Sequence, residues 1–184
     1  KDSAWVEIGN DVLMEYTKSG DGNYKEAKQK NIDFGGGVER ILTTLNGFED
    51  AYLLKIWQPI IKKIEELSKK KYKGNEKPMR IIADHIKAAV FILAEKIEPS
   101  NTEQGYVLRR LIRRAIKYGK DLSIPKNTDL TTPLTKEILK IYSDYSELKQ
   151  NQKFIIDELN KEEEKFEKTL EKGLNKFEKI IREK

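Results

Sequence analysis

Residues 80–119, RIIADHIKAAVFILAEKIEPSNTEQGYVLRRLIRRAIKYG, decide the fold because apolar residues recur in them at helical spacing. A first helix is predicted over residues 79–97, with one inward-facing side made of Ile82, Ile86, Ala89, Val90 and Leu93. A second helix is predicted to run to Tyr118, with a buried side made of Leu108, Leu111, Ile112 and Ala115. The stretch therefore indicates two consecutive amphipathic helices.

The ends of the second helix carry their own signals. Ser100, or Asn101 beside it, can cap the helix, and Glu103 supplies the chemistry of a capping box. Gly119 is a plausible stop because glycine adopts the backbone conformation that commonly ends a helix.

Working outward, the same apolar spacing predicts more helices. Pro59 is expected to start or kink a helix within residues 53–67. Two further helices are predicted over residues 133–145 and 154–181, and residues 69–78 and 121–129 read as connections. The last helix is long and amphipathic, with apolar positions Leu159, Phe166, Leu170, Leu174, Phe177 and Ile181.

The N-terminal part has a different pattern. Residues 4–16 and 24–34 are predicted to be antiparallel strands joined by the turn cluster of residues 19–23. A lone hairpin is marginally stable, so these strands are expected to belong to a larger sheet. The predicted fold is mainly α, a helical bundle with a long C-terminal amphipathic helix, preceded by a short antiparallel β segment. Its expected domains are residues 1–48 and 49–184.

Composition narrows the function classes. The 184 residues contain 36 Lys and Arg against 31 Asp and Glu, a net charge of +5 that is compatible with a nucleic-acid partner or with a solvated Lys-rich surface. The absence of cysteine excludes disulfides, thiolate zinc sites and a cysteine nucleophile. No apolar run is long enough to span a bilayer and no signal peptide is seen, so the cytoplasm is the expected location. The first residue is not Met, which favours a chain that continues upstream.

A glycine-rich segment, DFGGGVER at residues 33–40, joins the second strand to the next helix. Consecutive glycines allow a ligand close to the backbone, and Arg40 near the helix start could hold a phosphate. Asp33 is an acceptor suited to an ammonium group. The alternative is a simple turn with a capping Glu and a surface Arg. The spacing matches neither a P-loop nor a dinucleotide fingerprint.

Arginines form a stripe on the second helix of the deciding stretch. Arg109 and Arg110 recur four residues later as Arg113 and Arg114, which suits a phosphate backbone. Asn101 precedes this helix, and its amide could read base edges. The alternatives are intramolecular salt bridges for the arginines and a plain N-cap for Asn101.

His85 is the only histidine, and no second histidine lies four residues away. A metal pair is therefore not supported, and no metal site is expected. A structural role is the favoured interpretation of His85.

Together, four stretches resemble alanyl-tRNA synthetases, which are class II aminoacyl-tRNA synthetases, and they occur in the family's order. They are EIGNDVLMEY (7–16), NIDFGGGVERI (31–41), the deciding stretch (80–119) and EEEKFEKTLEKGL (162–174). The most specific part is PSN-x-x-x-GYVLRR-x-x-RRA. The resemblance implies ATP-dependent activation of alanine and its transfer to tRNA(Ala), with residues 1–48 ending the catalytic domain and residues 49–184 forming a tRNA-recognition domain.

The resemblance also implies residue roles. The segment around Arg40 looks like motif 3 of class II synthetases, so ATP contacts are expected from Gly35, Gly37, Glu39 and Arg40. Residues matching the alanine site are Asn10, Val12 and Asp33. Asn101 matches the asparagine that helps recognise the G3·U70 wobble pair of the acceptor stem. The remaining expected tRNA contacts are Arg109, Arg110, Arg113 and Arg114.

The sequence departs from the family at four positions. Phe34 and Gly36 replace the usual Thr and Met, Gly9 stands at a usual Trp, and Gln104 replaces a frequent Arg. Class II motifs 1 and 2, a second base-reading carboxylate, and the editing and C-terminal domains would lie outside this chain. ATP with Mg²⁺ is expected in the full-length enzyme and none bound to the fragment, which is expected not to aminoacylate alone. The alternatives are a stand-alone RNA-binding or regulatory module derived from a synthetase, or a helical protein whose charges are merely solvated.

Overall fold

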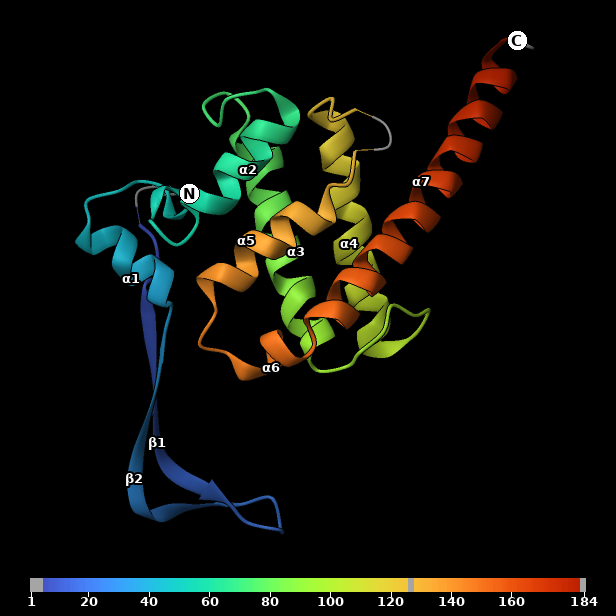
Figure 1. Ribbon diagram of the computed structural model, residues 1–184. Helices are drawn as coiled ribbons and strands as arrows, with labels where there is room; N and C mark the ends of the chain where they lie inside the picture. The colour runs from blue at the N-terminus through green and yellow to red at the C-terminus, as the bar shows by residue number, and fades with distance from the viewer. Residues whose placement is uncertain (1–4, 126–127, 183–184) are drawn as a thin grey trace. The chain divides into compact units, whose positions relative to one another are not determined.

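The computed structural model describes residues 5–125 and 128–182 and confirms the predicted fold class. The chain divides into two compact units, Lys1–Leu54 and Lys55–Lys184. The first holds a β-hairpin and a short helix, and the second holds the other α-helices (Figure 1).

The hairpin of the first unit pairs β1 (Gly9–Lys18) with β2 (Tyr24–Gly36) in antiparallel fashion. Both strands run past the residues at which they were predicted to end. An irregularity between Met14 and Tyr16 shifts the register. Most side chains of the two strands are exposed. Helix α1 (Val38–Leu45) and the 3₁₀ turn η1 (Ala51–Leu53) follow.

The second unit is a bundle of six helices within the described residues. They are α2 (Gln58–Ser68), α3 (Glu76–Ala94), α4 (Glu103–Asp121), α5 (Thr131–Ile141), α6 (Ser146–Gln150) and α7 (Gln152–Arg182). Helix α3 packs against α2, α4, α5 and α7, so it forms the centre of the bundle (Figure 1). The C-terminal half of α7 extends beyond the other helices of this unit. No helix in the described part of the chain is both long and apolar enough to cross a membrane.

The apolar face predicted for α3 forms the core. The five inward-facing residues are fully buried, as are Leu108, Ile112 and Ala115 of α4, whereas Leu111 is only half-buried. Full burial of the Ile, Val and Leu side chains among these contributes about 1.5–3 kcal/mol each. On α7, Leu159 is buried, Phe166 and Leu170 are half-buried, and Phe177 and Ile181 are exposed. Leu174 lies outside the side chains that the structure describes.

Two predicted features of α4 are wrong. The N-cap is Thr102, which makes no side-chain capping bond, whereas the Oγ of Ser100 donates to the carbonyl of Thr102 at 2.9 Å. The helix also continues through Gly119 to Asp121. A Cβ at Gly119 would lie 3.0 Å from Cδ2 of Leu130, so this glycine serves close packing inside the helix and does not end it.

Candidate nucleic-acid interface and hairpin site

Helix α4 presents a cationic hollow beside α7. The hollow measures about 350 Å³ and is lined by Tyr106, Arg109, Arg110, Arg113, Arg114, Lys117 and Phe166. All four arginines predicted for this helix therefore lie together around one concavity. A concavity with five cations favours a polyanion over a small neutral ligand.

Two of the arginines face solvent. Arg110 and Arg114 are exposed, lie one helical turn apart, and form no ion pair with any residue of the described part of the chain. The guanidinium of Arg114 lies 5.9 Å from the ring centre of Tyr118, and Nζ of the exposed Lys117 lies 5.4 Å from the same centre. These three cations are thus open to an external anion.

Arg113 is held from the side of α7. Its Nε donates to Oε1 of Glu162 at 2.6 Å, and its guanidinium lies 5.3 Å from the ring centre of Phe166. The Glu162 side chain is only 5% exposed and that of Arg113 is 28% exposed. An Arg has five N–H donors, so the terminal nitrogens of Arg113 remain available for a ligand while Glu162 fixes the plane of the group.

Asn101 is tied to the same helix. Nη1 of Arg109 donates to Oδ1 of Asn101, and both the Asn101 loop and its side chain are exposed. The loop is anchored further along the chain by the hydrogen bond from the amide of Ser100 to the carbonyl of Gly105, at 3.0 Å. Asn101 is therefore positioned by α4 but does not line the hollow. Of the alternatives that the sequence left open, an intramolecular salt bridge is found for Arg113. Asn101 is not the N-cap of α4, because that position is Thr102.

The hairpin brings the residues that match the alanine site onto one face. Val12 pairs directly with Asp33, and Asn10 pairs directly with Gly35. Paired residues, and residues two apart along a strand, share a face of the sheet. A Cβ at Gly35 would lie 3.1 Å from Oδ1 of Asn10, so glycine keeps the Asn10 amide uncovered. This face offers a carboxylate and an amide to a ligand with an ammonium group.

Gly9, Phe34 and Gly36, which depart from the family pattern, lie together on the opposite face of the hairpin. Gly9 pairs with Gly36, and the Phe34 ring lies over both of them. A Cβ at Gly9 or at Gly36 would approach this ring to 3.1 Å. The ring at Phe34 therefore requires small residues at the other two positions, and the three departures form one coupled arrangement that leaves the face of Asp33 unobstructed.

The end of β2 places Arg40 at the start of α1. Nη1 of Arg40 donates to the carbonyl of Glu7 at 2.8 Å, and the amide of Gly37 donates to the carbonyl of Ile8 at 3.0 Å. A Cβ at Gly37 would lie 3.2 Å from Cδ of Arg40, so the arginine folds over a glycine backbone. The exposed guanidinium beside a helix N-terminus can hold a phosphate group.

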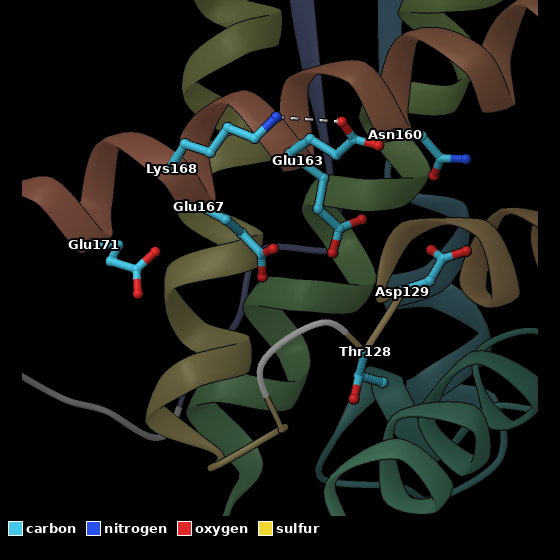
Figure 2. Close-up of a pocket in the computed structure, with 8 residues that line it drawn as sticks. Thr128, Asp129, Asn160, Glu163, Glu167, Lys168 and Glu171 are labelled. Carbon is cyan, nitrogen blue, oxygen red and sulfur yellow. Dashed lines mark ion pairs between the residues drawn. The ribbon is translucent and has the colours of Figure 1, made fainter.

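An acidic hollow of about 560 Å³ lies on α7 next to the segment before α5, and Figure 2 shows the residues that line it. Glu163 accepts from the amides of Leu130 and Thr131 at 3.1 Å each and from Oγ1 of Thr131 at 2.6 Å. Burial raises the pKa of Glu163 above its ordinary value, although these hydrogen bonds oppose the change. Glu163 thus binds the start of α5. Among residues 5–125 and 128–182, no cluster of acidic or histidine side chains is arranged to hold a metal ion.

His85 lies mostly buried on α3. Its Nδ1 is 2.9 Å from Oδ2 of Asp84, and its buried Nε2 has no hydrogen-bond partner in the part of the chain that the structure describes. The neighbouring carboxylate orients the ring through this contact.

Sequence reasoning missed three residues of the cationic hollow's surroundings: Tyr106, Glu162 and Phe166. Tyr106 precedes Arg110 by four residues, so helical spacing could have placed it on the stripe. Glu162 and Phe166 come from α7, about fifty residues later, and no local spacing relates them to α4.

Comparison with known proteins gives one consistent family. The family of class II (A) tRNA synthetases matches residues 1–184. Alanine–tRNA ligases from Borrelia hermsii, Treponema pallidum and Thermotoga maritima are 46%, 38% and 37% identical to this chain over 97%, 96% and 98% of its length. The aligned region covers 31%, 30% and 21% of those relatives, so the chain spans about a third of their length or less.

Proposed function

Because this chain belongs to the class II tRNA synthetase family, we propose that it is a segment of an alanine–tRNA ligase that contributes acceptor-stem binding and part of the amino-acid activation site. The observation that carries the RNA-binding part is the cationic hollow on α4, where Arg110, Arg114 and Lys117 face solvent. Residues 1–48 would end the catalytic domain and residues 49–184 would form the tRNA-recognition domain. The cytoplasm remains the predicted location.

In this proposal the arginines of α4 bind phosphates of the acceptor stem. Such contacts fix the register of the RNA but carry no sequence information. Arg110 and Arg114 would bind without breaking an ion pair of the described residues, and Arg113 would add its terminal nitrogens in an orientation set by Glu162. Asn101, held by Arg109 at the exposed loop, would supply the base-edge contact that distinguishes the wobble pair.

The hairpin would contribute to amino-acid activation in the whole enzyme. Asp33 would accept from the ammonium group of alanine, with Asn10 and Val12 beside it on the same face. Gly35, Gly37, Glu39 and Arg40 would form the motif 3 side of the ATP site. ATP would enter with Mg²⁺, which this chain would not bind through a ligand set of its own. Arg40 would stabilise the negative charge on a phosphate of ATP while the alanine carboxylate attacks.

The direct test is binding of the chain to an acceptor-stem minihelix that carries the wobble pair, against the same RNA with a G·C pair, at two salt concentrations. We expect binding that weakens with salt and that favours the wobble pair. Arg110→Ala/Arg114→Ala should reduce the slope of log affinity against log salt by about two, since each phosphate contact contributes about one. Asn101→Ala should bind the two RNAs equally.

A charge-matched control is available on α7, where Lys172 and Lys176 are exposed and line none of the hollows described above. Lys172→Ala/Lys176→Ala removes the same charge and should retain the wild-type salt slope. An equal loss of RNA affinity in the arginine and lysine variants would show that net charge alone binds the RNA and would refute the assignment to α4.

The activation part has a separate test. The purified chain should not catalyse ATP–pyrophosphate exchange, because the motif 3 residues of its hairpin and α1 form only one side of the proposed ATP site. Exchange above the level of an Arg40→Ala variant would refute that expectation.

A further inference from the structure

A third hollow lies at the C-terminal end of α5. It measures about 420 Å³ and is lined by residues of α5, α6 and the turn between them, together with Gln152 at the start of α7. It shares no lining residue with the cationic hollow of α4. Its volume is within the range of pockets that bind small ligands. Its wall combines two tyrosines with three lysines (Tyr142, Tyr145, Lys136, Lys140 and Lys149).

The two tyrosines are held in place by an aromatic cluster with α3. The ring centre of Phe91 lies 5.1 Å from that of Tyr142 and 5.4 Å from that of Tyr145, and the two tyrosine centres are 5.9 Å apart. All three contacts are edge-to-face, which is a favourable geometry for aromatic pairs. A ligand that contacts these rings therefore meets a surface that is already ordered.

Tyr145 is the ring that remains open. Nζ of Lys87 lies over the Tyr142 ring at 5.4 Å, so part of that ring already faces a cation. Tyr145 is 51% exposed and has no cation over it in the described part of the chain. An open aromatic ring beside an apolar floor, here the buried Leu148, suits a planar group that can stack.

The lysines around the rings favour an anion. Lys140 is paired with Glu137 at 2.9 Å. Lys136 and Lys149 are exposed and make no ion pair within the described ranges, so their charges are open to a ligand. A planar group that carries an anion fits this combination of side chains better than an acidic peptide does, because the ordered ring offers a stacking surface of one base's size.

We propose that this hollow binds an unpaired nucleotide, with its base stacked on Tyr145 and its phosphate held by Lys136 and Lys149. The base of a paired stem is not available for such stacking, since both of its faces are covered by neighbouring base pairs. The site goes beyond the acceptor-stem contacts proposed for α4. Its ligand is either a free nucleotide or an unpaired nucleotide of an RNA strand, and both present the same base and phosphate.

The test is an NMR titration of the ¹⁵N-labelled 184-residue chain with three probes: uridine monophosphate, a six-nucleotide single-stranded RNA, and a blunt-ended RNA duplex of two strands with no unpaired nucleotide. We expect the amides of Ser143, Tyr145 and Lys149 to shift with the first two probes and not with the third. A single strand that binds at least tenfold more tightly than the monophosphate would identify RNA as the source, and comparable affinities would identify the free nucleotide.

Two tyrosine variants test the stacking. Tyr145→Ala should reduce affinity for the single strand roughly tenfold, the effect expected from losing one stacked base. Tyr145→Phe keeps the ring and should bind like the wild type. Because Tyr145 is half-exposed, the spectrum of each variant away from the hollow should be unchanged, which checks that the bundle remains folded.

The lysines are tested against substitutions at Lys172 and Lys176, the two α7 positions that also serve as the control for stem binding. Lys136→Gln/Lys149→Gln should weaken the salt dependence of single-strand binding, and Lys172→Gln/Lys176→Gln should not. The proposal is overturned if Tyr145→Ala binds as tightly as the wild type, or if the blunt duplex shifts the same amides. An Arg110→Ala/Arg114→Ala variant that loses stem binding but retains these shifts would separate this site from that of α4.

Discussion

Replacing Glu162 with Gln should lower the stability of the helical unit without weakening its binding to RNA. Glu162 is 5% exposed and accepts from Nε of Arg113 at 2.6 Å. A hydrogen bond to a charged partner contributes about 1.5–3 kcal/mol and a neutral one about 0.5–1.5 kcal/mol. Gln retains an acceptor but loses the charge, so the free energy of unfolding should fall by about 1 kcal/mol. The decrease is small because Arg113 is 28% exposed to water.

The loss should appear as a decrease of about 2–4 °C in the midpoint of thermal unfolding, followed by circular dichroism. Glu164→Gln is the matched control, because Glu164 is the next-but-one residue of α7, is 72% exposed and lies 3.8 Å from Lys168. That control should unfold like the wild type. The Glu162→Gln variant should bind the minihelix at least as tightly as the wild type, since one negative charge beside the hollow is removed.

Two outcomes would refute this reasoning. Equal stability of the wild type and the Glu162→Gln variant would mean that the ion pair does not join α4 to α7. A tenfold loss of RNA affinity in that variant would mean that Arg113 binds RNA only when Glu162 orients it.

Three more predictions follow from single contacts. Burial raises the pKa of Glu163, so this residue should contribute most to stability below about pH 4.5 and progressively less as pH rises through its folded pKa. In denaturant titrations, the stability advantage of the wild type over Glu163→Gln should therefore shrink as pH rises above about 4.5, and a constant difference would contradict this. Gly105→Ala places a methyl group against the carbonyl of Glu98 and the Oγ of Ser100 and should cost about 1–3 kcal/mol in the same titrations, an effect excluded if the two proteins unfold alike. Phe34→Ala should weaken the hairpin by about 0.2–1 kcal/mol and speed amide hydrogen exchange in β1, and unchanged exchange would argue against the ring's cross-strand role.

The helices could be predicted because their apolar spacing is local. The inward face of α3 is correct residue by residue, since each of its positions is repeated at three or four residues along the same helix. The ends of α4 could not be predicted in the same way. Gly119 has the chemistry of a helix stop, but the approach of Leu130 makes it a packing position, and that approach depends on how α5 folds back.

Only part of the hairpin site could be predicted from the sequence. A strand, a turn and a returning strand put Asn10 and Val12 near Asp33 in any antiparallel register close to the observed one. The resemblance to the family named these residues, and the register explains why they can act together. The relation of Phe34 to the two glycines opposite it could not be read from the sequence, because it depends on a ring that crosses from one strand to the other.

The arginine stripe of α4 is two rows with different surroundings. Arg109 and Arg113 contact acceptors of the protein itself, whereas Arg110 and Arg114 face solvent, although the spacing within each row is the same. Arg113→Ala should therefore lower the unfolding midpoint, because it leaves the carboxylate of Glu162 buried without its partner, while Arg114→Ala should leave the midpoint unchanged. Arg114→Ala should instead reduce the salt slope of minihelix binding by about one. If Arg114→Ala lowered the midpoint as much as Arg113→Ala does, the two rows would be equivalent, and the distinction between a row that also stabilises the fold and a row that only binds RNA would be wrong.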